Sequence, residues 1–138
     1  MSINQIQDEI IEEFSGFEDW MDRYSLLIEY GNELEPMNEA DKNDTNLIDG
    51  CQSKVWITAE VVDGKVIYHG DSDAILVKGI VALLLRVFSN HTAQEIVDAN
   101  LYVLDEIQLK EHLSPTRSNG LVAMLQQMRL FALTFAQR

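Results

Sequence analysis

A β-hairpin signature lies near the middle of the chain and limits the folds that the chain can adopt. Residues 55–62 and 65–71 are rich in β-branched and aromatic side chains, and only Asp63-Gly64 separates the two runs. This residue pair favours a two-residue type I′ turn, so the sequence predicts an antiparallel hairpin. Two strands alone are marginally stable in water, and we therefore expect a third strand or close helix cover.

Two helical patterns precede the hairpin. Between residues 3 and 14, apolar side chains recur at three- and four-residue spacing, which predicts an amphipathic helix. Residues 17–30 carry a second pattern of this kind, and Gly31 follows it in the position of a residue that ends a helix. We expect the two helices to form a helical hairpin.

Further helices are expected after the hairpin. Residues 73–88 are apolar around most of a helical circumference, which is typical of a central buried helix. Thr92 is a suitable cap for a short helix over residues 93–98, and Ser114-Pro115 opens a last helix that runs to about Ala136. This order of elements predicts one domain over residues 1–138, with an α+β fold whose helices gather on one side of a small antiparallel sheet.

The charge balance limits the classes of partner. Ten Lys and Arg residues against 23 Asp and Glu residues give a net charge of -13. Such a field repels phosphate backbones and anionic headgroups, so we expect neither nucleic acid nor a membrane surface as a partner. No signal-peptide pattern opens the chain, and no apolar run reaches the roughly 20 residues of a membrane helix. Together with a single cysteine, these patterns predict a protein of the reducing cytoplasm.

Cys51 is the only cysteine, and it lies in a polar turn between a long polar connection, residues 32–50, and the first strand. It can form no internal disulfide, so a functional role for Cys51 would depend on its thiol. A loop that presents the sulfur suits thiol chemistry, and long loops inside small domains are often functional. The alternative for this connection is an insertion that the fold merely tolerates. The alternative is that Cys51 is a small buried apolar side chain, as many free cysteines are.

Other chemistries find less support in the sequence. A cysteine hydrolase would need a histidine beside Cys51, and no local signature joins His69, His91 or His112 to it. Clusters of cysteine and histidine that could bind a soft metal are not present in the sequence. Asp71-Ser72-Asp73 precedes an apolar helix, so capping of that helix explains it better than a site for a hard cation.

Three motif blocks occur in order along the chain. They are Gly50-Cys51-Gln52-Ser53-Lys54-Val55-Trp56, then Gly70-Asp71-Ser72-Asp73-Ala74 with Val77-Lys78-Gly79, and finally Leu113-Ser114-Pro115-Thr116-Arg117-Ser118-Asn119-Gly120-Leu121. In these blocks the chain resembles the SufE family, the sulfur acceptors of iron–sulfur cluster assembly, including its CsdE relatives. The resemblance spans nearly the whole chain and implies a fold similar to that of the IscU scaffold.

The resemblance also implies a function. Cys51 would accept sulfane sulfur from the persulfide of a SufS-type or CsdA-type cysteine desulfurase, and would pass it to a scaffold such as SufB. The family has no cofactor of its own, because pyridoxal phosphate belongs to the desulfurase, whose turnover SufE-like proteins raise. The protein would thus be a sulfur carrier rather than a stand-alone enzyme.

The same resemblance implies supporting roles for residues near Cys51. Gly50 would be the hinge of the cysteine loop, with Gln52 beside the thiol. Asp73 would cap the central helix and hold the loop, while Arg117 would orient the loop or favour a persulfide anion. Arg117 lies in the first turn of a helix, where a cation opposes the helix dipole, so a functional reason for its position is expected. The competing hypothesis is a non-catalytic adaptor in which Cys51 only packs.

Overall fold

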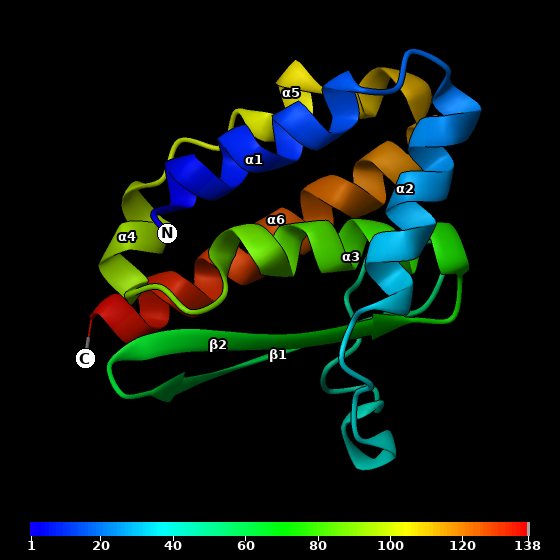
Figure 1. The fold of residues 1–138 in the computed structure, drawn as a ribbon. Coiled ribbons are helices and arrows are strands. Elements are labelled where there is room, and N and C mark those ends of the chain that lie inside the picture. Colours follow the sequence, from blue (N-terminus) through cyan, green and yellow to red (C-terminus); the bar gives the residue numbers. More distant parts are fainter. Residues whose placement is uncertain (138) are drawn as a thin grey trace.

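The computed structural model describes residues 1–137, and it places one β-hairpin beneath a layer of helices (Figure 1). The α+β fold is therefore confirmed. The elements in chain order are α1 (Ile3–Ser15), α2 (Trp20–Asn32), a short 3₁₀ turn (Glu39–Asp41), β1 (Val55–Val62), β2 (Lys65–Ser72), α3 (Ile75–Phe88), α4 (Ala93–Asp98), α5 (Val103–Glu106), a second 3₁₀ turn (Lys110–His112) and α6 (Pro115–Ala136).

The hairpin forms as its turn residues predict. β1 and β2 pair antiparallel from Val55 with Ser72 to Val62 with Lys65. Asp63 and Gly64 take φ angles of 52° and 80°, the positive values that a type I′ turn requires at both central positions. β2 continues one residue beyond the predicted end, to Ser72.

The expected third strand is reduced to a single bridge. Among residues 1–137 the sheet has two strands, and Leu47 forms an isolated antiparallel bridge with Trp56 on the outer edge of β1. The Ile48 amide donates to the Val55 carbonyl at 2.8 Å, and the Ile57 amide donates to the Asn46 carbonyl at 3.1 Å. Pairing ends there because the chain then turns through residues 49–54, and helix cover supplies the remaining burial.

α3 is the central buried helix that its sequence predicts. It lies between the hairpin and α1 (Figure 1), and its Leu83, Leu84 and Phe88 side chains are fully buried. Each such side chain contributes about 1.5–3 kcal/mol relative to an exposed one. Fully buried side chains from α1, α2 and α6, among them Phe14, Leu27 and Leu121, complete one hydrophobic cluster around it.

The prediction that Gly31 ends the second helix was wrong. Gly31 lies inside α2, which continues to Asn32. A Cβ atom on Gly31 would lie 2.9 Å from the backbone nitrogen of Gly79, and a Cβ on Gly79 would overlap the Leu27 carbonyl. The two glycines therefore allow the backbones of α2 and α3 to approach closely. α2 thus packs primarily on α3 rather than forming a simple hairpin with α1.

The caps of the later helices agree with the sequence. Thr92 accepts a hydrogen bond from the Glu95 amide at the start of α4, and Ser114 accepts one from the Arg117 amide at the start of α6. α5 and the turn before α6 were not predicted.

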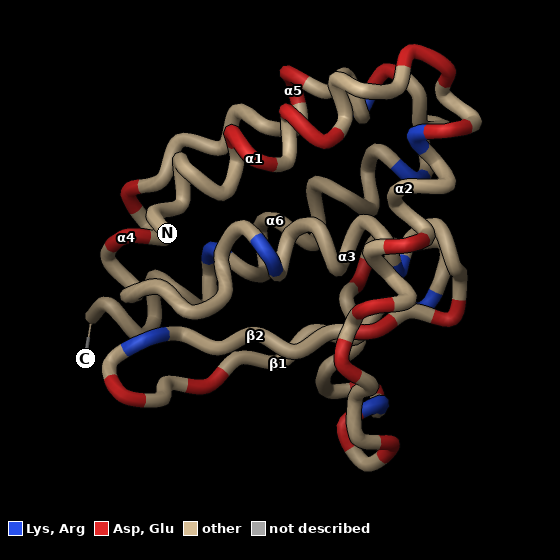
Figure 2. Tube along the Cα trace, in the orientation of Figure 1, with Lys and Arg blue, Asp and Glu red and all other residues tan. Residues whose placement is uncertain are grey.

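Acidic residues are spread along α1, α5 and the connection after α2 (Figure 2). Within residues 1–137 no helix is long and apolar enough to cross a bilayer.

Candidate functional site

Cys51 lies where its own loop meets the N-terminal parts of α3 and α6. The side chain is half-buried and faces a small cavity of about 10 Å³. A cavity of this size holds about one water-sized sphere. The other lining residues come from the cysteine loop, α3 and α6, and they are Gln52, Ser53, Val77, Ile80, Thr116, Arg117, Gly120 and Met124.

The cysteine loop is the tip of a short hairpin built on the outer edge of β1. Residues 46–48 run antiparallel to residues 55–57, so residues 49–54 form a closed loop between them. Gly50 has a φ of 91°, a conformation that side-chain-bearing residues rarely adopt. The sharp turn that brings Cys51 down onto α6 therefore depends on glycine at this position.

The resting sulfur is a neutral thiol. Burial raises the pKa of Cys51, because a thiolate loses hydration in this position. The Cys51 Sγ donates to the Gly120 carbonyl of α6 at 3.6 Å, an interaction that only the protonated form can make. Both effects disfavour the nucleophilic thiolate while the loop is closed.

Gly120 contributes to this site although its role was not predicted. A Cβ at residue 120 would lie 3.4 Å from the Cys51 Sγ and 3.6 Å from the Cys51 Cα, so a side chain larger than alanine would occupy the place of the sulfur. The signal that could have revealed it is a glycine inside α6, since glycine costs about 1 kcal/mol relative to alanine in a helix interior.

Arg117 and Gln52 are both brought to the cavity, and both are exposed to solvent. Within residues 1–137 the Arg117 guanidinium forms no ion pair and no hydrogen bond. It is the cationic side chain that lines the cavity, and it remains free to meet an anion there. The local cost of a cation in the first turn of α6 thus coincides with a position beside the thiol.

Asp73 does not cap the central helix. The cap position of α3 is Ala74, no side chain caps this helix end, and the Ala74 amide instead donates to the Ser72 Oγ at 3.3 Å. The Asp73 carboxylate accepts from the Lys54 amide at 3.0 Å, and the Asp73 amide donates to the Lys54 carbonyl at 3.2 Å. The prediction of capping was wrong because Asp73 turns toward the end of the cysteine loop.

The histidines do not reach the thiol. His69 pairs with Glu60 on the hairpin at 3.4 Å, and the His112 ring stacks on Trp20 at 3.8 Å. The His91 ring lies 3.0 Å from the Met1 carbonyl. In the described chain the hydrogen bond of the Cys51 sulfur is to Gly120, and no histidine lines its cavity. A cysteine hydrolase is therefore not supported. Residues 1–137 also contain no group of three or more potential metal ligands.

Comparisons with known proteins identify relatives of this chain in sequence and in fold. Residues 8–132 match the family described as SufE, Fe-S metabolism associated domain. An uncharacterized SufE-like protein of Synechocystis sp. is 43% identical over 126 residues, which cover 91% of this chain and 79% of that protein. The solution structure of a hypothetical protein from Thermus thermophilus superposes with a TM-score of 0.79 at 20% identity, covering 96% of this chain and 97% of the other, which shows the shared fold.

Proposed function

This chain belongs to the SufE family and has a role in Fe–S cluster assembly; from that membership and the geometry of its only thiol, we propose that Cys51 is a sulfur carrier. Cys51 accepts a sulfane sulfur from the persulfide of a SufS-type or CsdA-type cysteine desulfurase and delivers it to a SufB-type scaffold. The observation that carries the proposal is a lone, half-buried thiol on a loop that turns sharply at Gly50, facing a cavity of about 10 Å³.

The transfer is an exchange between two sulfur centres. The Cys51 thiolate attacks the outer sulfur of the desulfurase persulfide, a new S–S bond forms on Cys51, and the bond within the donor persulfide breaks. The desulfurase cysteine leaves as a thiolate, and the transferred sulfur keeps its proton. No external oxidant or reductant is needed, because the sulfane sulfur keeps its oxidation state.

The closed loop supports protection between transfers. An exposed thiolate is prone to oxidation, whereas the half-buried Cys51 is held as a thiol against Gly120. The loop must then open for Cys51 to reach a donor on another protein. Gly50 supplies the hinge, and binding of the desulfurase favours the open loop by contacting it.

The residues around Cys51 support the transfer in different ways. Arg117 stabilises the thiolate or persulfide anion once the loop moves, since an opposite charge nearby favours the ionised form. Gln52 offers an amide beside the sulfur, and Asp73 anchors the end of the loop at Lys54. These groups orient the sulfur rather than replace the chemistry of the desulfurase.

The cofactor chemistry belongs to the partners. Pyridoxal phosphate resides in the desulfurase, and the scaffold supplies the several thiolates that an Fe–S cluster needs, whereas this chain has one. Removal of the sulfur by Cys51 raises desulfurase turnover. A net charge of -13 is consistent with protein partners in the cytoplasm rather than nucleic acid or membrane.

The proposal is tested by intact mass. Incubation with a SufS-type desulfurase and cysteine adds one sulfur atom, about 32 Da, as the exchange mechanism requires. Dithiothreitol removes the added mass, and Cys51→Ser abolishes it. A wild-type protein that stays unmodified while the desulfurase itself carries a persulfide would overturn the proposal.

The alternative of a non-catalytic adaptor with a purely structural Cys51 predicts a different result. A structural thiol would resist iodoacetamide in the native state, and its replacement by serine would lower stability. A carrier thiol reacts in the native state through loop opening, and the fold does not need it.

A further inference from the structure

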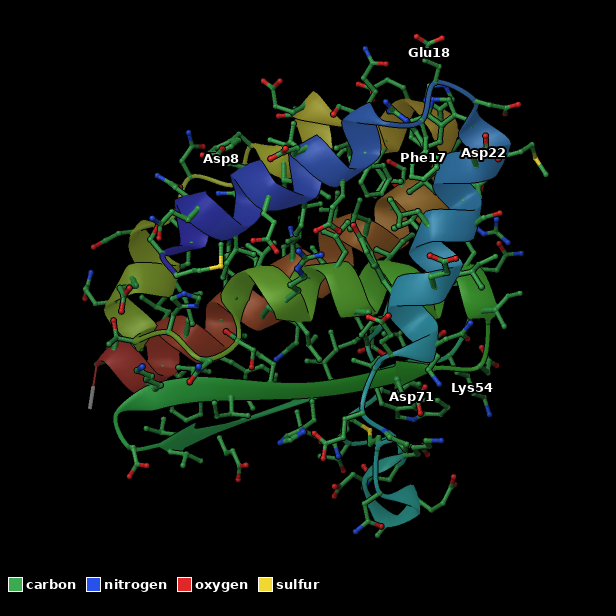
Figure 3. The ribbon with its side chains drawn as sticks, viewed as in Figure 1. Asp8, Phe17, Glu18, Asp22, Lys54 and Asp71 are labelled. Atoms are coloured by element: carbon green, nitrogen blue, oxygen red, sulfur yellow. The ribbon has the colours of Figure 1, made fainter. Side chains whose placement is uncertain are left out.

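The junction between β2 and α3 holds both ends of the segment that contains Cys51. At one end, the Lys42 ammonium lies 3.1 Å from the Asp71 carboxylate. At the other end, the Lys54 carbonyl accepts from the Ser72 hydroxyl at 2.8 Å, and the Lys54 amide donates to Asp73. Figure 3 shows Lys54 and Asp71 at the end of the hairpin where β1 begins and β2 ends. Residues 42–54 are therefore attached to the folded body at both ends, with Cys51 between.

Asp71 is an unusual residue for this position, because its side chain is only 7% exposed. Its carboxylate meets the ammonium groups of Lys42 and Lys78, at 3.1 and 3.5 Å, and accepts from the Ser72 amide at 2.8 Å. Burial alone would raise the pKa of Asp71, but Lys42, Lys78 and the Ser72 amide hold it below its ordinary value. A buried charge is weak evidence for stability, so another reason for its presence is to be sought.

Few buried side chains hold the connection that leads into the cysteine loop. Of residues 33–48, only Met37 and Ile48 are buried. Lys42 is better fixed than its neighbours, since its ammonium also lies 3.1 Å from Glu39 and 5.9 Å from the centroid of the Trp56 ring. Trp56 pairs with Asp71 across the hairpin, so Lys42 is held over the strand pair at the base of the loop.

We propose that Asp71 is a positioning residue for Cys51: its ion pair with Lys42 is a latch that keeps the cysteine loop closed over its cavity. This inference rests on the proposed sulfur transfer, in which the loop must open. Release of Lys42 detaches residues 42–45 from Asp71, and the two backbone hydrogen bonds that join residues 46–48 to β1 then break more readily. The arm that ends at Lys54 stays anchored at Ser72 and Asp73, so the loop opens from its N-terminal side.

The latch is tested by the rate at which iodoacetamide alkylates Cys51 in the native protein, with no desulfurase present. Lys42→Met removes the charge and keeps most of the side chain. We expect alkylation to be about fivefold faster, the shift that the loss of one partly exposed ion pair gives to an opening equilibrium. Lys42→Arg restores the pair and a rate near that of the wild type. Lys65→Met, at the opposite end of the hairpin, leaves the rate unchanged.

A second readout separates a latch from a general loss of stability. Hydrogen exchange at the Ile48 and Ile57 amides, which close the base of the loop, accelerates in Lys42→Met by a similar factor, whereas exchange at the Leu84 amide in α3 does not. Asp71→Asn gives the same pattern, and Asp71→Asn with Lys42→Met adds little to either single change. Equal alkylation rates in wild type and Lys42→Met, or faster exchange at Leu84 to the same degree, would overturn the latch. These two measurements involve no sulfur transfer. A failure of the proposed sulfur transfer would therefore be seen in the intact-mass experiment and not in them.

Discussion

The middle of α3 and its N-terminal end are held in place by different interactions. In the middle, Leu83 and Leu84 have no exposed surface, and Gly79 meets the backbone of α2. At the N-terminal end, Ile75 is 67% exposed and no side chain caps the helix. The adjacent segment 42–54, which contains the cysteine loop, is held there by hydrogen bonds and the Lys42–Asp71 ion pair. Apolar burial thus stabilises the fold, whereas the proposed latch depends on a small set of polar contacts whose loss need not unfold the rest.

The largest effect is expected from damage to the middle of α3. Leu84→Ala removes fully buried methyl groups and lowers the free energy of unfolding by about 2–5 kcal/mol. Chemical denaturation measures this loss, and Leu130→Ala, at a 55% exposed position on α6, is the control with little effect. The native-state alkylation rate of Cys51 stays that of the wild type. A large increase in that rate, with Leu84→Ala still folded, would show that the two regions are not independent.

Arg117→Ala tests the site at the N-terminal end of α3. It removes the cation that lines the Cys51 cavity, and we expect sulfur acceptance from a desulfurase to slow about tenfold through a less favoured anion at Cys51. The rate of appearance of the added sulfur in single-turnover mass measurements checks this, with the thermal midpoint as the test of folding.

Arg129→Ala is the matched control, because Arg129 lies on the same helix but does not line the cavity. Transfer at the wild-type rate in Arg117→Ala would remove Arg117 from the site.

Two substitutions at Gly120 test whether the space at this residue sets the position of the Cys51 thiol. Gly120→Ala places a methyl group in ordinary contact with the sulfur, at 3.4 Å, and keeps the loop closed. Gly120→Val needs the space of the sulfur itself, so it displaces Cys51 and raises its alkylation rate about threefold, as expected for a modest shift of the opening equilibrium. Equal alkylation of the alanine and valine variants would show that Gly120 does not set the position of the thiol.

The smallest expected effect is a dependence of stability on pH. The pKa of Cys51 is raised in the fold, so above the ordinary thiol pKa of about 8.5 the unfolded chain loses its proton first. The contribution of the half-buried thiol is therefore complete below that pH and is lost as the pH rises through the folded pKa. Urea unfolding across this range reports the decline, and Cys51→Ser removes it. A wild type and a serine variant with the same slope would contradict a buried neutral thiol.

Local chemistry made much of the fold predictable from the sequence. Asp63-Gly64 specified the turn, and Thr92 and Ser114 specified two helix starts, because each of these signals acts on neighbouring backbone groups. The motif around Cys51 is also a local signal, and it predicted that the thiol lies on a loop before the first strand.

What could not be predicted depends on partners that are distant in sequence. Gly31 looks like a helix end until Gly79 lies against it, and Asp73 looks like a cap until Lys54 is found within hydrogen-bond distance. Asp71 looks like part of the same cap, although its partners Lys42 and Lys78 come from two other segments. Gly120 is an unexplained helix glycine until the sulfur of Cys51 is placed beside it.

Sulfur transfer to Cys51 is measured by following radiolabelled sulfur from cysteine through a SufS-type desulfurase. If Cys51 is the sulfur carrier, one equivalent of label binds to this protein, is released by dithiothreitol and is absent from Cys51→Ser. Label bound equally well to the serine variant, or none bound to the wild type beside a fully labelled desulfurase, would contradict it.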